Sequence, residues 1–385
     1  MIAALDAASV VYLLTLLVAA ATAREPRRRG GGAARGVRFA VLVPAHDEER
    51  EIPKVLRSLA SQDYPHDLFV IVVIADNCHD RTAEIARGMG AVVYERSDVE
   101  RLGKGHALAW GIERIRGAHP DIDAIAILDA DCEPSANFLE EMAGHIANGA
   151  AGAQAQIQIG NPDEAWSAGL QAASFALIGE IQSRGRERLG LTARPRGTGT
   201  ALTLDLLDRV PWDAFSPAED AEYSARLVAR GERFDHAGHA VVTTRAATAL
   251  GATADQQRRW ESGRWALLRE WLPRHLAAGV RRRDARRLVA ALELLAPAQS
   301  RLLVTSVTAA AAGRALSLRT VTRLAAFNLV GQIVFVFGGL WVAGAPRSVF
   351  YALVRAPLLA AWKVPLHVRG LAGRRPTRWI RGPRS

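Results

Sequence analysis

Short apolar runs alternate with helix-patterned segments between Val37 and Leu128, and no other feature constrains the fold of this chain as strongly. Buried strands take this form, a short apolar run bounded by turn residues. Strands that alternate with helices predict an α/β fold, with a mostly parallel sheet covered by helices on both faces. The expected strands are 39–43, 69–75, 91–94 and 124–128, and the expected helices are 51–61, 80–88 and 105–115.

Polar residues gather where these expected strands end. Residues 46–49 follow the first strand, residues 76–77 follow the second, and residues 129–131 follow the fourth. Parallel sheets bind their ligands beyond the carboxyl ends of the strands. The sequence therefore predicts a binding site at that edge of the sheet.

Asp129 and Asp131 stand two positions apart after the fourth expected strand. On an extended backbone, residues two apart project to the same side. Two carboxylates so placed can share a hard cation with phosphate oxygens, as Mg²⁺ and Mn²⁺ sites require. An ordinary turn is the competing interpretation, because turns that follow strands are rich in Asp.

Glu219 and Asp220 directly precede an expected helix at 221–230. Acidic residues in a first helical turn interact favourably with the helix dipole, so capping is one interpretation. The functional interpretation is a general base that takes a proton from an attacking hydroxyl. Further along, Arg259 could pair with a diphosphate, and Trp260 could stack on a sugar ring. A basic amphipathic helix at a membrane surface would carry the same two residues.

Asp76 and Lys104 are two more candidate ligand contacts. Asp76 ends the second expected strand, where a carboxylate can accept hydrogen bonds from a base or a ribose. Lys104 lies between Gly103 and Gly105, in a segment without the spacing of a P-loop. It is either an exposed cation near phosphates or part of an ordinary helix entry loop.

An apolar segment without charge, residues 7–23, precedes the α/β region and is followed by Arg24, Arg27, Arg28 and Arg29. Its length permits one membrane helix. The competing interpretation is a cleaved secretory signal, but the arginines lie on the wrong side for one. By the positive-inside rule, the N-terminus lies outside and the next domain lies in the cytoplasm.

Apolar segments also follow the α/β region. Residues 324–346 are long enough to span a membrane, and residues 302–313 are a shorter candidate. Two crossings would return the basic tail to the cytoplasm, as the charge bias prefers. Residues 286–295 and 353–371 are expected to lie in the membrane interface.

Charge is distributed unevenly along the chain. No Asp or Glu follows Glu293, and this tail carries twelve Arg and one Lys, so that subtracting its +13 from the net +10 leaves −3 for the rest. The basic part is interleaved with long apolar runs, which fits a membrane surface better than nucleic acid.

Taken in order, the motifs resemble those of the membrane-bound family 2 glycosyltransferases, which include cellulose, chitin and hyaluronan synthases and related exopolysaccharide enzymes. The similarity covers roughly residues 37–270. The motifs that carry it are Val43-Pro44-Ala45-His46-Asp47-Glu48, Asp76, Gly103-Lys104-Gly105, Asp129-Ala130-Asp131, Gly197-Thr198-Gly199, Glu219-Asp220, and Gln256-x-x-Arg259-Trp260.

This resemblance implies a GT-A fold and inverting, metal-dependent transfer from a nucleotide-diphosphate sugar, usually a UDP-sugar, to a polysaccharide or lipid-linked acceptor. The metal would be Mg²⁺ or Mn²⁺. By position, Pro44, Ala45, Glu48 and Asp76 would line the base and ribose pocket, Lys104 would lie near the diphosphate, Asp129 and Asp131 would hold the metal-diphosphate, Asp220 would be the catalytic base, and Glu219, Gln256, Arg259 and Trp260 would contact the diphosphate and acceptor.

The expected organisation is an anchor at 1–23, a basic linker at 24–36, a GT-A domain at 37–270, and a membrane region at 271–385 with about two spans. Expected partners are the nucleotide sugar, a glycan or lipid-linked acceptor, membrane lipids and an export protein, but not nucleic acid. Two alternatives stay open. One is a membrane scaffold that binds a nucleotide sugar without turnover, and the other is a basic membrane-associated nucleic-acid binder.

Overall fold

The structure, a computed structural model, describes residues 2–23, 36–248, 250–295 and 299–371, and the side chains of 250–262, 363 and 365–371 lie outside this description. The chain divides into two compact units. The α/β unit comprises residues 24–160 and 192–245. The helical unit comprises residues 1–23, 161–191 and 246–385. Segment 161–191, which the sequence suggests is part of one continuous domain, thus belongs to the helical unit.

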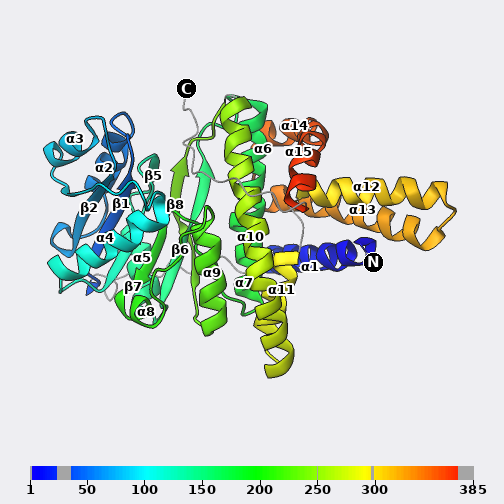
Figure 1. Cartoon of the computed structure of the whole chain (residues 1–385), viewed down its shortest axis with the longest axis horizontal. Helices are drawn as coiled ribbons and strands as arrows, with labels where there is room; N and C mark the ends of the chain where they lie inside the picture. Colours follow the sequence, from blue (N-terminus) through cyan, green and yellow to red (C-terminus); the bar gives the residue numbers. More distant parts are fainter. Residues whose placement is uncertain (1, 24–35, 249, 296–298, 372–385) are drawn as a thin grey trace. The chain divides into compact units, whose positions relative to one another are not determined.

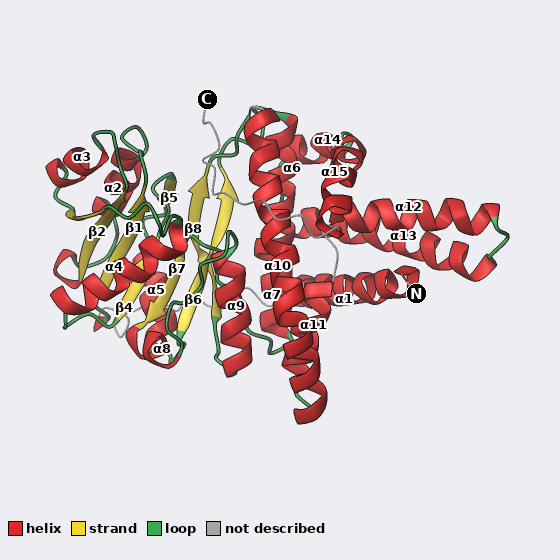
Figure 2. Cartoon of the chain, viewed as in Figure 1, coloured by secondary structure: helices red, strands yellow, loops and turns green. Residues whose placement is uncertain are grey.

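One mixed sheet forms the centre of the α/β unit, and Figure 2 shows its strands in yellow. The strand order is β3-β2-β1-β4-β7-β6-β8-β5. The first four of these are parallel, β7 runs antiparallel to β4 and β6, β8 runs parallel to β6, and β5 runs antiparallel to β8. The strands are β1 (Phe39–Ala45), β2 (Phe69–Asp76), β3 (Val92–Arg96), β4 (Ala124–Ile127), β5 (Cys132–Pro134), β6 (Gly152–Ile159), β7 (Thr200–Thr203) and β8 (Asp235–Thr244).

The parallel half of the sheet forms because its strands are apolar on both faces. In β1, Phe39, Val41 and Val43 pack into one hydrophobic cluster, while Ala40 and Leu42 pack into the other. Strands buried on both sides read as continuous apolar runs rather than as alternating ones. The four predicted strands and three predicted helices of this half are therefore confirmed, with ends that shift by up to three residues.

Helices cover both faces of this sheet, as the labels in Figure 1 allow the reader to follow. Helices α2 and α5 pack in the first cluster, and α4, α8 and α9 pack in the second. The helices of the unit are α2 (Ile52–Ala60), a 3₁₀ turn (His66–Leu68), α3 (Thr82–Gly88), α4 (Lys104–Ala118), α5 (Phe138–Ala147), α8 (Leu204–Arg209) and α9 (Glu219–Arg230).

Among the described residues of the helical unit, α1 and α13 are long and apolar enough to cross a membrane, and α11 with α12 would add a third span if they formed one bent crossing. Helices α12 and α13 lie side by side (Figure 1). The helices are α1 (Ile2–Thr22), α6 (Trp166–Phe175), η3 (Ala176–Ile181), α7 (Gln182–Arg188), α10 (Leu250–Arg282), α11 (Ala285–Leu295), α12 (Gln299–Ala315), α13 (Arg319–Val342), α14 (Arg347–Leu353) and α15 (Ala356–Leu371).

Helices α6, η3 and α7 follow one another without a break, and the six residues of η3 have π-helical geometry. Helix α7 then meets α1 at very close range. A Cβ on Gly185 would overlap the carbonyl oxygen of Leu16, so only glycine permits this approach. Arg186 of α7 forms a buried ion pair with Glu293 of α11 at 2.5 Å, and Tyr12 of α1 also contacts Glu293.

Candidate active site

A charged cluster in the α/β unit joins the first residue of α4, the turn after β4 and the first turn of α9. Its centre is the ammonium of Lys104, which forms an ion pair with Asp129. The same nitrogen donates a hydrogen bond to the carbonyl oxygen of Gly197 at 2.6 Å and lies 3.8 Å from Glu219 Oε1. Four sequence motifs, separated by up to 116 positions, thus meet around one cation.

The surrounding carboxylates keep Lys104 charged. Burial alone would lower the pKa of this ammonium, but the negative charges of Asp129, Glu219 and Asp220 outweigh burial and raise the pKa. A permanent positive charge at this point suits a site that receives an anionic ligand.

Glu219 and Asp220 form a pair of carboxyl groups whose pKa values are both raised, so both are weaker acids than usual. Burial raises the pKa of Glu219 to about 7, against the attraction of Lys104. Burial also raises the pKa of Asp220, although Asp220 Oδ1 accepts a hydrogen bond from the backbone N–H of Ala221 at 2.7 Å. A carboxyl group that titrates near neutral pH can take up and release a proton under physiological conditions, as a general base must.

Asp129 and Asp131 lie in a turn rather than on an extended strand, so the predicted reason for their proximity is wrong in detail. Strand β4 ends at Ile127, and the N–H of Cys132 donates to the carbonyl oxygen of Asp129 at 3.1 Å, which closes the turn. One ligand atom from each of Asp129, Asp131 and Cys132 lies within 4.8 Å of the others.

This donor set fits a hard divalent cation. Burial raises the pKa of the Cys132 thiol well above its usual value, and a soft sulfur ligand does not suit a hard cation. The two carboxylates remain as oxygen ligands, which Mg²⁺ and Mn²⁺ prefer. Cys132 is therefore better described as a packing residue of the turn.

The loop between Arg196 and Thr200 is held by Gln154, a buried residue of β6 that the sequence did not identify. Gln154 Nε2 donates to Thr198 O at 2.8 Å, and its Oε1 accepts from the N–H of Arg196 at 2.8 Å and from Thr200 Oγ1 at 2.6 Å. Thr198 Oγ1 in turn accepts from the N–H of Asp129 at 3.0 Å. The loop connects the turn of Asp129 and Asp131 to Gly197, whose φ of 79° favours glycine.

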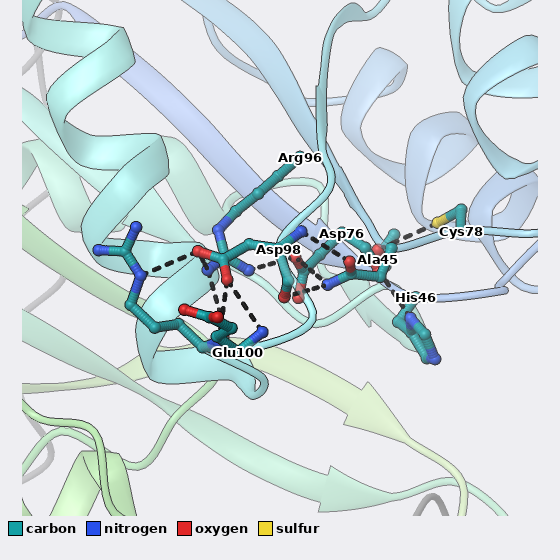
Figure 3. Close-up of polar contacts among 9 residues, drawn as sticks. Ala45, His46, Asp76, Cys78, Arg96, Asp98 and Glu100 are labelled. Atoms are coloured by element: carbon teal, nitrogen blue, oxygen red, sulfur yellow. Dashed lines mark hydrogen bonds and ion pairs between the residues drawn. The ribbon is translucent and has the colours of Figure 1, made fainter.

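Asp76 is paired with Arg96, another residue that the sequence did not identify. The two residues end β2 and β3 in register, and Arg96 Nη1 lies 2.6 Å from Asp76 Oδ1 (Figure 3). Arg96 also pairs with Asp98 at 3.0 Å. Burial raises the pKa of Asp76, and Arg96 opposes this shift. Arg96 therefore compensates and orients a carboxylate that would otherwise be buried at high cost.

The other predicted base-pocket residues lie at the same edge. Pro44 and Ala45 end β1 beside the end of β2, and His46 Nδ1 lies 2.7 Å from the carbonyl oxygen of Asp76. The N–H of Glu48 donates to Thr82 Oγ1 at 2.7 Å. The structure thus brings Pro44, Ala45, Glu48 and Asp76 together, and their roles remain predictions.

Three predicted site residues are not placed. Gln256, Arg259 and Trp260 fall within α10, but their side chains lie outside the described residues. Their predicted contacts with the diphosphate and acceptor therefore rest on the motif alone.

The first turn of α4 packs tightly on the loop that precedes α9. A Cβ on Gly105 would overlap the carbonyl oxygen of Ala214. Beside this contact, the rings of His106 and Phe215 stack with centroids 4.3 Å apart and an angle of 8° between their planes. The elements that carry Lys104 and Glu219 are thereby fixed to each other.

We expect Gly105→Ala to lower the free energy of unfolding by about 1–3 kcal/mol, because the added methyl group forces α4 away from the loop. Gly117→Ala is the matched control in the same helix, because nothing lies within 4 Å of a Cβ at that position. Thermal unfolding of the two variants measures the difference. Equal stability of both variants would show that the contact at Gly105 relaxes without cost.

Comparison with known proteins gives a family assignment. The sequence model described as "Glycosyltransferase like family 2" matches residues 36–263. Glycosyltransferase AglD of Haloferax volcanii is 32% identical over 123 residues, which are 30% of this chain and 19% of that protein. The 4,4'-diaponeurosporenoate glycosyltransferase of Staphylococcus haemolyticus is 36% identical over 98 residues, 24% of each chain. Beta-monoglucosyldiacylglycerol synthase of Trichormus variabilis is 28% identical over 232 residues, 58% of this chain and 48% of that protein.

These matches span less than half of the length of each of the three relatives. Among solved structures, the mannosyltransferase PcManGT of Pyrobaculum calidifontis, in complex with GDP-mannose and Mn²⁺, is 19% identical with a TM-score of 0.49 and covers 87% of this chain and 98% of its own. The family match covers more than half of the 385 residues and includes every described member of the charged cluster. It confirms the predicted resemblance to family 2 glycosyltransferases and, with the observed sheet, the predicted GT-A class of α/β fold. The chain belongs to glycosyltransferase family 2.

Proposed function

We propose that the chain transfers a sugar from a nucleotide-diphosphate sugar, such as a UDP-sugar, to a lipid-linked or polysaccharide acceptor, with inversion at the anomeric carbon. The observation that carries this proposal is the cluster of Asp129, Glu219 and Asp220 around Lys104 in a family 2 domain. The names of two relatives, which refer to diaponeurosporenoate and to diacylglycerol, support an acceptor of lipid character.

In the proposed reaction, Asp220 takes the proton of an acceptor hydroxyl as its oxygen attacks the anomeric carbon. A new carbon–oxygen bond forms to the acceptor, and the bond from that carbon to the nucleoside diphosphate breaks. A divalent ion held by Asp129 and Asp131 would supply positive charge to the leaving diphosphate. Glu219 lies beside both Asp220 and Lys104 and adjusts the charge balance between them.

Lys104 is proposed to change partners when the donor binds. Its ammonium pairs with Asp129 in this structure and is only half-buried. The charged oxygens of a diphosphate should attract the Lys104 ammonium more strongly than the single carboxylate of Asp129 does. Movement of Lys104 toward the diphosphate would release Asp129 as a ligand and place positive charge where negative charge develops.

The acid limb of the pH profile is expected above the usual range of carboxylates. Burial raises the pKa of Glu219 to about 7 and raises the pKa of Asp220 above its ordinary value, so both groups take up protons at a higher pH than ordinary carboxylates do. A protonated Asp220 accepts no further proton, and kcat/KM therefore falls tenfold per pH unit at most. Initial rates between pH 5 and 9 at saturating metal measure this limb. A profile that stays flat down to pH 5 would contradict it.

We further propose that α1 and α13 cross the membrane and that the α/β unit lies in the cytoplasm. Support comes from the length and apolar character of both helices and from the arginines that follow α1 in the sequence. Protease protection of oriented membrane vesicles tests the orientation. Digestion of the α/β unit from the outer side would contradict it.

The proposed activity is tested by incubating detergent-purified full chain with a panel of nucleotide sugars, with and without Mn²⁺ and with membrane lipids as acceptors. Metal-dependent transfer, or slow hydrolysis of one donor, is the expected result. Tight binding of a nucleotide sugar without transfer or hydrolysis under any condition would instead support the non-catalytic scaffold.

A further inference from the structure

A groove of about 640 Å³ runs along α1 in the helical unit. Among the described residues it is lined by one side of α1 and by the end of α7, through Val11, Leu14, Thr15, Val18, Ala19, Thr22, Arg188 and Leu189. We propose that this groove binds one acyl chain of an anionic membrane phospholipid, with the lipid phosphate paired to Arg188. The proposal rests on the membrane location of α1 in the proposed function.

The wall of the groove is apolar. Val11 is 53% exposed, Val18 63% and Leu189 46%. A contiguous patch of exposed apolar side chains is unusual on a protein that is surrounded by water. The hydroxyls of Thr15 and Thr22 donate to carbonyl oxygens of their own helix, both at 2.8 Å. Neither hydroxyl therefore needs a partner in the groove. Such a lining suits a hydrocarbon chain and offers little to a sugar or a nucleotide.

The length of the groove matches one leaflet of a bilayer. Val11 and Thr22 are separated by eleven residues of α1, which rise roughly 16 Å at about 1.5 Å per residue. The hydrocarbon core of a bilayer is about 30 Å thick, so one leaflet contributes about half of that. An acyl chain that follows this face of α1 would cover its exposed side chains from the centre of the bilayer to the interface.

The cation in the lining indicates an anionic headgroup. Helix α7 crosses α1 near Leu16 and Ala20, and Arg188 at the end of α7 lines the groove beside the apolar residues of α1. Arg184 and Arg186 of the same helix pair with Glu180 at 3.2 Å and Glu293 at 2.5 Å. Arg188 is exposed and forms no ion pair with any residue in the described part of the chain.

In the sequence, Arg24, Arg27, Arg28 and Arg29 follow shortly after the last residue of α1. Basic residues next to a membrane helix attract anionic lipids, each by about 1 kcal/mol. An anionic phospholipid satisfies both the apolar wall and the cation in the lining. A zwitterionic lipid satisfies only the wall.

The test uses the full chain in nanodiscs of phosphatidylcholine that contain a small fraction of phosphatidylglycerol with a photoreactive diazirine in its acyl chain. After irradiation, digestion and mass spectrometry locate the label. We expect it on α1 between Val11 and Thr22, and about fivefold less of it when the photoreactive lipid is phosphatidylcholine.

Two pairs of variants make the test specific. Val18→Trp fills the groove and should abolish this label, whereas Val330→Trp on α13, at a residue that is 61% exposed, should not. Arg188→Gln should reduce phosphatidylglycerol labelling about fivefold, to the level of phosphatidylcholine. Arg314→Gln, which removes an exposed arginine from α12, should have no effect on α1.

Equal labelling of α1 and α13 that Val18→Trp leaves unchanged would overturn the groove. Displacement of the label by a polyprenyl phosphate but not by phosphatidylglycerol would overturn the choice of occupant. A preparation that transfers sugar but shows no preferential label contradicts the groove alone. One that is labelled as expected but acts on no donor contradicts the proposed activity alone.

Discussion

Asp220→Asn should lower the transfer rate by about 10²–10⁴-fold, the contribution usual for a general base. The substitution keeps the shape of the side chain, and the amide oxygen can still accept the hydrogen bond from the N–H of Ala221. It removes the ability to take a proton from the acceptor. Donor binding should stay close to that of the unchanged protein, because Lys104, Asp129 and Asp131 are intact.

Transfer kinetics and calorimetric titration with UDP measure these two quantities separately. Asp213→Asn is the matched control, because Asp213 is an exposed carboxylate in the preceding loop that pairs with Arg226 at 2.8 Å. Glu219→Gln discriminates between the two neighbouring carboxyl groups. If Glu219→Gln stops transfer and Asp220→Asn does not, the base has been assigned to the wrong residue.

Asp131→Asn should reduce transfer by about 10³-fold, since a metal ion contributes several kcal/mol to charge stabilisation and about 1.4 kcal/mol corresponds to tenfold. Asp131 supplies one of the two carboxylates in the turn that we propose as the metal site, and the neighbouring Cys132 offers sulfur, which a hard cation does not prefer. The loss should appear both as weaker Mn²⁺ binding and as weaker metal-dependent binding of the donor.

Electron paramagnetic resonance of Mn²⁺ measures metal binding directly and without turnover. Asp121→Asn, at an exposed position before the other end of β4, is the matched control. Removal of metal with EDTA from the unchanged protein should reproduce the defect, and added Mn²⁺ should reverse it. Full activity in EDTA would contradict the proposal that Asp129 and Asp131 bind a catalytic metal ion.

The parallel half of the sheet could be predicted from the sequence, whereas the half formed by β5 to β8 could not. Strands β1 to β4 are recognisable in the sequence because each contains an unbroken apolar run. Strand β6 instead alternates glutamine with apolar residues, and Gln154 and Gln156 are nevertheless buried. A buried glutamine such as Gln154, whose amide is hydrogen-bonded to the backbone and to Thr200, looks in sequence like a solvent-facing residue. Segment 161–191, which folds with the helical unit, further separates β6 from β7.

The positions of the site carboxylates could be predicted, but their partners could not. Asp76, Asp129 and Asp220 are visible because strand ends and helix starts are local features. The hydrogen bond of Lys104 to Gly197 joins residues 93 positions apart, and the pairing of Asp76 with Arg96 depends on strand register. Such contacts follow from topology, which no local pattern encodes.

The π-helical segment η3 determines the rotation of the following helix, α7, about its own axis. A π turn holds one more residue than an α turn, so it rotates everything downstream relative to an unbroken α-helix. If Ala176–Ile181 kept all six residues but took α geometry, α7 would turn by about 100°, the angle of one α-helical residue. Gly185 would then no longer face Leu16, where only glycine fits. Deleting one residue from this segment would instead remove the bulge and leave α7 close to its present orientation, because the π turn holds the one residue that an α turn does not need. This segment should therefore tolerate a one-residue deletion better than a return to α geometry at full length.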